Sequence, residues 1–273
     1  MKKTNKDQPL ERLKYIATET INHRYSEHVK IFTDGSKVAG SASAAMWVED
    51  HNFKKGWKLQ HGDYRNIMGA ELFAINEALS WLLIHNTIME NRRTVILSDS
   101  LSGLMALKSG KSSSHTYILN KIKTKLKDLT EAEMSTTIQW IPGHVGIHGN
   151  EEADAAAKQT LSLATETFFP LDTSEIKALL KDGRNRSWQL LYEQKRDQLH
   201  IGSIKRFIKH WDWASHKDRA TEATVARLRI GHCGLKAHLH RFNQSDSSNC
   251  IGCNQPETTD QFLLHCENYT EER

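Results

Sequence analysis

Two short apolar segments of the chain each end at an aspartate. Residues 28–34 (HVKIFTD) and 94–99 (TVILSD) have the apolar pattern of β-strands, within which aspartate is disfavoured. The first segment is followed by Gly35 and Ser36, a pair that is typical of turns. We therefore expect two strands that stop at their aspartates and belong to one sheet.

The spacing of apolar residues predicts the elements around these two strands. Helices are expected at 68–84, 101–108 and about 118–129, and further strands at 41–50, 53–60 and 135–142. After a loop with three glycines, Asn150 is the expected N-cap of an Ala-rich helix that carries Glu151 and Glu152 in its first turn. This order indicates an α/β fold, with a mixed five-stranded sheet flanked by helices.

A chain of 273 residues is long enough for one large domain or two small ones. Phe168-Phe169-Pro170 marks the expected boundary, and helices are predicted beyond it at 174–196 and 201–214. The predicted divisions are an N-terminal extension (1–27), an α/β domain (28–165), a basic and mainly helical region (172–241) and a Cys-containing tail (242–273).

Charge is distributed unevenly along the second half of the chain. Residues 177–241 hold 15 Lys or Arg and 6 Asp or Glu, whereas residues 242–273 hold 1 and 6. Such blocks suggest a basic surface followed by an acidic end, although a solvated helix face has the same composition. The overall net charge of +4 is by itself a weak argument for nucleic-acid binding.

Cysteine usage and hydropathy favour an intracellular protein, nuclear or cytoplasmic and not secreted. All four cysteines lie in the last 41 residues, so a disulfide framework is not expected. The basic N-terminus lacks the apolar segment of a signal peptide. No run approaches the ~18 consecutive apolar residues of a membrane span, so no membrane partner is expected.

Four carboxylates stand at positions where a structural role alone would not place them. Asp34 and Asp99 end apolar strands, Glu71 leads the apolar stripe of a helix, and Asp154 lies one turn into another helix among alanines. Each one alone is better explained as a turn, cap or surface residue. Together they predict a cluster, because ligands of open α/β sheets gather where strands end. Carboxylates held together need cations, and oxygen ligands without Cys or His favour Mg²⁺ or Mn²⁺.

The motifs around these carboxylates resemble a known family. TDGS (33–36), AEL (70–72), SDS (98–100) and WIPGHVGIHGNEEADAAA (140–157) are similar, in this order, to type 1 ribonuclease H as carried by non-LTR retrotransposons beside their reverse transcriptase. The resemblance covers residues 28–165. Downstream, RLRIGHCGLKAHLHRF (227–242) and a CxxC followed by HC resemble the tail that follows ribonuclease H in these elements.

The resemblance implies endonucleolytic cleavage of the RNA strand of RNA–DNA hybrids. It assigns the acidic tetrad to Asp34, Glu71, Asp99 and Asp154, which would hold two Mg²⁺ ions, with Mn²⁺ able to substitute. Asp34 and Asp99 are the expected central ligands, Glu71 serves one ion and Asp154 the other. His144 matches the histidine of the mobile loop, which shuttles a proton or assists product departure. The alternative for His144 is a loop residue with no role, and none is assigned to His148.

Substrate choice is expected to follow from shape, because a hybrid presents 2′-hydroxyls across a wide minor groove. Gly35, Ser36 and Ser100 lie beside the metal ligands in sequence and are the expected contacts to those hydroxyls. The chain departs from the cellular enzymes in its first hairpin (KVAGSASAA) and at Ile67-Met68, where those enzymes carry two asparagines. These differences affect the expected contacts with the hybrid at those positions, and they do not affect the expected cleavage chemistry.

Other nucleases of this fold differ in the order of their acids. A DEDD exonuclease would carry Asp-x-Glu in its first strand, and an integrase would show Asp, Asp, Glu, whereas this chain has Asp, Glu, Asp, Asp. The remaining alternative is a non-catalytic module that binds hybrid or duplex, whose signature would be a lost carboxylate. The 27 residues before the first strand cannot hold a polymerase, so the chain is either a piece of a retroelement polyprotein or free-standing.

The tail carries a candidate zinc site. Cys250-x-x-Cys253 has the spacing of a zinc knuckle, and Cys266 is the expected third ligand. Related retroelement tails place a histidine where this chain has Gln261. The remaining candidates for the fourth ligand are His265, His232, His238, His240 and Cys233. The alternative is a set of ordinary thiols, or a site that has decayed.

Overall fold

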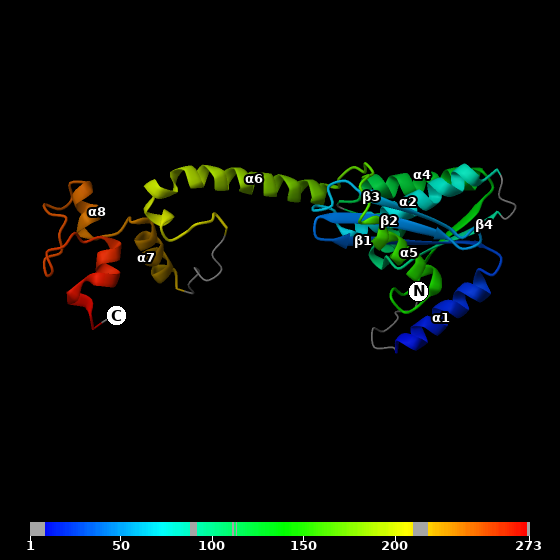
Figure 1. The fold of residues 1–273 in the computed structure, drawn as a ribbon, viewed down its shortest axis with the longest axis horizontal. Coiled ribbons are helices and arrows are strands. Elements are labelled where there is room, and N and C mark those ends of the chain that lie inside the picture. Colours follow the sequence, from blue (N-terminus) through cyan, green and yellow to red (C-terminus); the bar gives the residue numbers. More distant parts are fainter. Residues whose placement is uncertain (1–8, 88–91, 111, 113, 210–217, 272–273) are drawn as a thin grey trace. The chain divides into compact units, whose positions relative to one another are not determined.

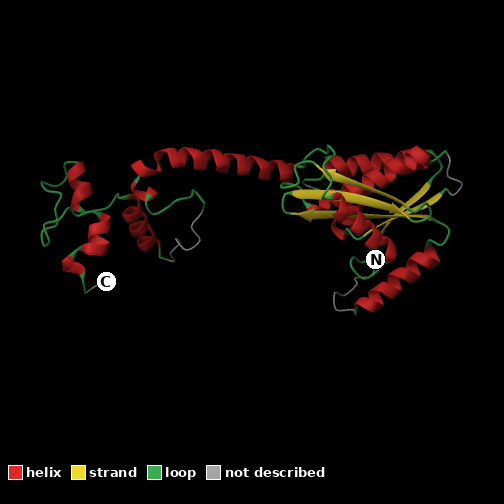
Figure 2. Ribbon diagram, in the orientation of Figure 1, coloured by secondary structure: helices red, strands yellow, loops and turns green. Residues whose placement is uncertain are grey.

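The structure is a computed structural model that describes residues 9–87, 92–110, 112, 114–209 and 218–271 (Figure 1). The chain divides into two compact units, Met1–Leu179 and Leu180–Arg273. The first unit contains a sheet with helices on both faces, and the second is mainly helical (Figure 2).

The sheet of the first unit is mixed and five-stranded, in the order β3-β2-β1-β4-β5. The strands are β1 (Val29–Val38), β2 (Ser41–Val48), β3 (Phe53–Leu59), β4 (Arg93–Ser98) and β5 (Ser135–Trp140). The first three form an antiparallel meander, whereas β4 and β5 run parallel to β1. The predicted fold class and element order are confirmed.

Helices cover both faces of this sheet (Figure 1). The helices of the first unit are α1 (Leu10–Arg24), α2 (Ile67–His85), α3 (Leu101–Ser109), α4 (Thr116–Glu131) and α5 (His148–Thr160). One apolar cluster joins α2 and α4 to the sheet, and a second joins α1 and α5 to the opposite face. The two clusters draw on alternating residues of the strands, such as Ile31 and Phe32, because successive side chains of a strand point to opposite faces.

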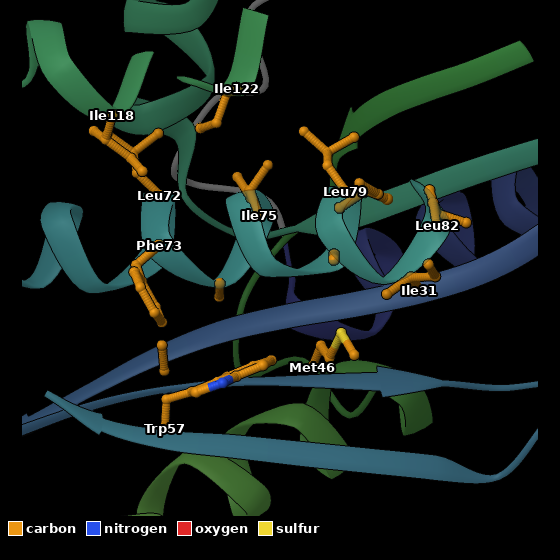
Figure 3. Close-up of a cluster of buried hydrophobic side chains, with 14 of the residues drawn as sticks. Ile31, Met46, Trp57, Leu72, Phe73, Ile75, Leu79, Leu82, Ile118 and Ile122 are labelled. Atoms are coloured by element: carbon orange, nitrogen blue, oxygen red, sulfur yellow. The ribbon is translucent and has the colours of Figure 1, made fainter. Parts of the chain in front are cut away.

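The helix α2 is the centre of the larger cluster (Figure 3). Its Ile75 and Leu79 are fully buried between the sheet and α4, where Ile118 and Ile122 face them. Among the described helices, α2 passes the length and composition test for a membrane span. Because more than half of it is buried inside the unit, we interpret it as a core helix.

The strand β1 is longer than its sequence predicts, because it does not stop at Asp34. Its parallel pairing with β4 ends at Thr33, but its antiparallel pairing with β2 continues to Val38. Gly35 is therefore a strand residue and not a turn residue. A Cβ on Gly35 would lie 2.8 Å from the backbone nitrogen of Glu71, so the glycine permits close approach of α2 to the strand.

The helix α5 begins two residues before the predicted N-cap. His148 is its first residue and Ile147 the residue before it, so Asn150 lies within the helix. Ile147 is buried in the second apolar cluster, and this packing favours the earlier start. Glu151 then accepts a hydrogen bond from the backbone nitrogen of Gly146 at 3.2 Å, which ties the preceding loop to the first turns of the helix.

The sequence expected only an extension before residue 28, but α1 packs on the sheet. Its Ile21 and the following Tyr25 are buried in the second cluster beside Phe32 and Val95. The boundary between the two compact units falls between residues 179 and 180 of the sequence, whereas the predicted boundary lies near residue 168. The division into independently folding domains stays a prediction.

A buried ion pair ties the segment after residue 168 to the first unit. The Arg65 guanidinium is fully buried and lies 3.0 Å from the Glu175 carboxylate at the start of α6 (Thr173–Lys195). It also donates to the carbonyl oxygens of Phe169 and Pro170 and lies over the Phe169 ring. Phe169 itself packs against Phe73 of α2. The Phe-Phe-Pro segment is therefore a packed part of the first unit.

The second unit is built from short helices. After α6 come η1 (Arg196–Gln198), η2 (His200–Gly202), α7 (Arg219–Ile230), α8 (Lys236–Arg241), η4 (Gln261–His265) and η5 (Glu267–Tyr269). The predicted helix at 201–214 is wrong for residues 203–209, and residues 210–217 lie outside the described residues. Side chains of α6 bind the backbone there: Tyr192 donates to the Lys205 carbonyl, and Gln189 accepts from the Ile208 nitrogen. These bonds take the place of helical ones.

We expect Arg65→Met to destabilise the first unit by about 3–5 kcal/mol, because it leaves the buried Glu175 carboxylate without its cation. Urea unfolding measures the change. Lys127→Met, which breaks the exposed Lys127–Glu131 pair, should cost less than about 0.5 kcal/mol. A double variant, Arg65→Met/Glu175→Leu, should recover part of the loss. Equal stability of the single and double variants would contradict the stranded-charge explanation.

Candidate active site

The four predicted carboxylates come from four different elements of the first unit. Asp34 lies in β1, and Asp99 directly follows β4, which is the parallel neighbour of β1. Glu71 lies in the first part of α2, close to Gly35 of β1. Asp154 lies in the second turn of α5, on the other face of the sheet. All three of the others act electrostatically on Asp34, so the structure brings the four together.

Burial and mutual repulsion make this cluster hold protons. The pKa of Asp34 is raised to about 8, first by burial and then by the Asp99 charge, with Asp154 and Glu71 adding to the effect. A hydrogen bond from the Gly35 backbone opposes this rise. Burial also raises the pKa of Glu71. An all-oxygen cluster of this kind fits hard divalent cations, which would relieve the repulsion.

Asp34 accepts from the Gly35 backbone, and each of the other three carboxylates has a side-chain hydrogen-bond donor. Ser100 donates its hydroxyl to Glu71. The Asn150 amide lies 3.3 Å from Oδ2 of Asp99, and the Lys158 ammonium lies 2.6 Å from Oδ2 of Asp154. Such donors fix the orientation of ligating carboxylates.

Sequence reasoning missed the roles of Asn150 and Lys158. The sequence predicts Asn150 as a helix cap. Its amide instead contacts Asp99, a residue 51 positions earlier in the sequence. Lys158 could have been found, because it stands four residues after Asp154 on a predicted helix and therefore shares its face.

His144 lies on the loop between β5 and α5. It is exposed and adopts a positive φ of 55°, which is uncommon for a residue other than glycine. The preceding residue, Gly143, passes so close to Asp99 that a Cβ would lie 2.4 Å from its carboxylate oxygen. The backbone next to His144 therefore adjoins the carboxylate cluster. His148 lies on the far side of the loop, where its ring packs on Trp47.

Comparison with known families identifies this arrangement. The RNase H family matches residues 26–162, which is half of the chain and contains all four carboxylates and His144. The chain belongs to the RNase H family. The family and fold support an RNA–DNA hybrid nuclease function in general terms, and the family generally uses divalent metal ions such as Mg²⁺.

Two solved structures are among those that match the chain. RNase H1 from the archaeon Halobacterium salinarum shares 17% identity over 49% of this chain and 97% of its own, with a TM-score of 0.37. The N-terminal RNase H domain of Rv2228c from Mycobacterium tuberculosis, solved as a fusion with maltose-binding protein, shares 18% over 49% and 94%, with a TM-score of 0.35. A comparison with curated proteins finds no match.

The residues predicted to contact the hybrid have different environments in this RNase H domain. Gly35 is packed against α2, and Ser36 is a strand residue paired with Ser43. Ser100 is buried, and its hydroxyl donates to Glu71 while it accepts from the Gly103 nitrogen at 3.3 Å. Ser100 therefore both begins α3 and orients Glu71. Its contact with a 2′-hydroxyl stays a prediction.

Outside the RNase H domain, the structure brings three of the four cysteines together. The sulfurs of Cys250, Cys253 and Cys266 all lie within 4.8 Å of one another. Cys233 is not part of this group, since its sulfur lies 4.0 Å from the Thr259 hydroxyl. His265, the predicted fourth ligand, is exposed and is also outside the group.

We expect Asp34→Asn to stabilise the metal-free protein in a pH-dependent way. The folded-state pKa is about 8 against an ordinary value of 3.8, so the folded state holds the proton more tightly and loses stability as pH rises across that window. Asparagine does not ionise. The gain should therefore be small below about pH 4, reach about 1.4 kcal/mol, the value of one pKa unit, near pH 5, and grow further up to about pH 8.

Thermal or urea unfolding in the presence of a chelator measures this gain. Asp128→Asn makes the same chemical change at an exposed carboxyl of α4 and should alter stability by less than about 0.5 kcal/mol. An Asp34→Asn protein that is less stable than the wild type at about pH 8 would show that the cluster is not under repulsion.

Proposed function

We propose that this chain is a metal-dependent endonuclease that hydrolyses the RNA strand of RNA–DNA hybrids. The observation that carries the proposal is the gathering of Glu71, Asp99 and Asp154 around the buried carboxyl of Asp34, whose pKa is raised to about 8. Membership of the RNase H family supports the substrate class. A site with this repulsion is suited to binding cations and not to structural packing.

The donor set fits two Mg²⁺ ions, or Mn²⁺ in their place. Asp34 and Asp99 would be the central ligands, with Glu71 completing one site and Asp154 the other. When bound, the ions neutralise phosphate charge and activate water for attack on the phosphodiester. The protein's own contribution is to hold these carboxylates in position in advance, which Ser100 and Asn150 do through their hydrogen bonds.

Lys158 and His144 act at the edges of the cluster. The Lys158 ammonium is the counter-charge of Asp154 in the metal-free protein, and its side chain is exposed enough to move aside. His144 stands on an exposed loop that adjoins Asp99, where an imidazole can carry a proton to the leaving oxygen or assist product departure. The backbone at Gly35 and Ser36 would contact the 2′-hydroxyls that distinguish RNA from DNA.

The second candidate is a module that binds hybrid or duplex without cleaving it. The retention of all four carboxylates argues against it, because a binding module has no need to keep a repulsive cluster. We also infer a retroelement origin and an intracellular location. The downstream segment 227–242 and the CxxC of the tail support the origin, and the absence of cysteine from the first 232 residues supports the location.

The reaction is tested with an RNA–DNA hybrid labelled in its RNA strand. With Mg²⁺ or Mn²⁺ present, we expect short RNA fragments from the hybrid, while single-stranded RNA and duplex DNA stay largely intact. Asp99→Asn should abolish cleavage, because it removes a central ligand charge at nearly constant size. Circular dichroism checks that the variant is folded. Hybrid binding without cleavage by the wild type in either metal would favour the binding module.

His144→Ala should slow cleavage by roughly 10²-fold, at the lower end of what general acid–base assistance contributes. Metal affinity should be unchanged, since the imidazole is not a ligand. His148→Ala is the matched control, four residues along on the same loop and helix start, and should cleave at the wild-type rate. Single-turnover rates decide the matter, and equal rates for the two variants would remove His144 from the mechanism.

A further inference from the structure

The three sulfurs of the second unit lie at the separations of metal ligands. The cysteine cluster, defined as Cys250, Cys253 and Cys266, has Sγ–Sγ distances of 3.9 Å between Cys250 and Cys266 and 3.7 Å between Cys266 and Cys253. A tetrahedral zinc with bonds of about 2.3 Å to sulfur separates two such ligands by about 3.8 Å. A disulfide would bring two sulfurs to about 2.05 Å. The observed spacing is that of a tetrahedral edge.

Gln261 stands beside this cluster, in contact with Cys253. Its side-chain nitrogen lies 2.9 Å from the Cys253 sulfur, and its side-chain oxygen is buried with no hydrogen-bond partner. A half-turn of the amide exchanges the two atoms and turns the oxygen toward the sulfurs. An amide oxygen can ligate a divalent metal, and this one has no other partner to lose. The exposed His265 is not placed to do so.

The loop that carries the first two cysteines is shaped around the cluster. A Cβ on Gly252 would lie 1.6 Å from the Asn268 amide, so only glycine fits between the two. Asn268 in turn lies 3.9 Å from the Cys250 sulfur. The backbone nitrogens of Cys253 and Gly252 donate to the same sulfur, and such bonds orient a ligating side chain.

The described part of the second unit buries very few apolar side chains. Within its described part, Cys250 and Cys266 are the only buried hydrophobic side chains. A small unit without an apolar core needs a cross-link to be stable. In a protein without disulfides, a bound metal ion is one of the few cross-links available. The cluster joins the loop at residues 250–253 to the end of the η4 segment, where Cys266 lies.

We propose that the cysteine cluster binds one zinc ion and that the Gln261 side-chain oxygen completes the coordination of this zinc. The ion stabilises the tail in place of an apolar core. The soft sulfur donors select zinc over the hard cations that suit the carboxylate cluster. The site is structural, since all four positions are taken by protein atoms. It is independent of the proposed hydrolysis, so either can fail without the other.

The test starts from the full chain, purified reduced and without chelator. Mass spectrometry of the metal content should find about one zinc per chain. Replacement of the zinc with Co²⁺ should give the sulfur-to-metal absorption of several thiolate ligands. Cys253→Ser should lose the zinc, whereas Cys233→Ser, which alters the cysteine outside the cluster, should keep it. A reduced wild type without zinc, or equal losses in both variants, would overturn the site.

Two variants at position 261 test the fourth ligand. Gln261→Ala should weaken zinc affinity by at least about tenfold, the lower bound seen when a supporting partner is lost from a metal site. Gln261→His should restore or tighten binding, because imidazole is itself a good zinc ligand. Affinities come from competition with a chromophoric chelator. Wild-type affinity in Gln261→Ala would remove Gln261 from the coordination.

Limited proteolysis tests the structural role. Removal of zinc by a chelator should make residues 242–271 more easily cleaved, while the RNase H domain resists as before. Intact-mass analysis of the fragments locates the cuts, and the chelator-treated Cys253→Ser variant should show no further change. Unchanged proteolysis of the wild type after zinc removal would show that the ion does not hold the tail together.

Discussion

The repulsion between Asp34 and the neighbouring carboxylates is the interaction on which the active site depends. Apolar packing determines where the backbone carries these residues: α2 is wedged against the sheet by Ile75 and Leu79, and Gly35 lets it approach β1 closely. The strands therefore cannot move apart to separate the charges. Burial first, and then this repulsion, raise the pKa of Asp34, so this carboxyl retains its proton unless a cation neutralises the cluster.

The donors around the cluster divide into two kinds. Ser100 and Asn150 are neutral, buried groups that hydrogen-bond to Glu71 and Asp99. Lys158 is an exposed cation that pairs with Asp154. Buried donors at the centre and an exposed cation at the edge suit the proposed site, which must bind ions in a defined geometry and still release a product.

The two units separate hard from soft ligand chemistry. The RNase H domain offers carboxylate oxygens and contains no cysteine, whereas three of the cysteines meet in the second unit. The two proposed metal sites therefore differ in ligand type, with oxygens suited to Mg²⁺ in the first and sulfurs suited to Zn²⁺ in the second. The first unit is stabilised by a large apolar core on both faces of its sheet, and the proposed zinc gives the tail a stabilising link of another kind.

Local patterns of apolar residues and short motifs were enough to predict the order of strands and helices within residues 28–165 and the four carboxylates. Contacts between distant residues decided the rest. The extension of β1 past Asp34 depends on pairing with β2, and the earlier start of α5 depends on burial of Ile147. The Arg65–Glu175 pair spans 110 positions. The fold places the Gln261 amide, and not the exposed His265, beside Cys253.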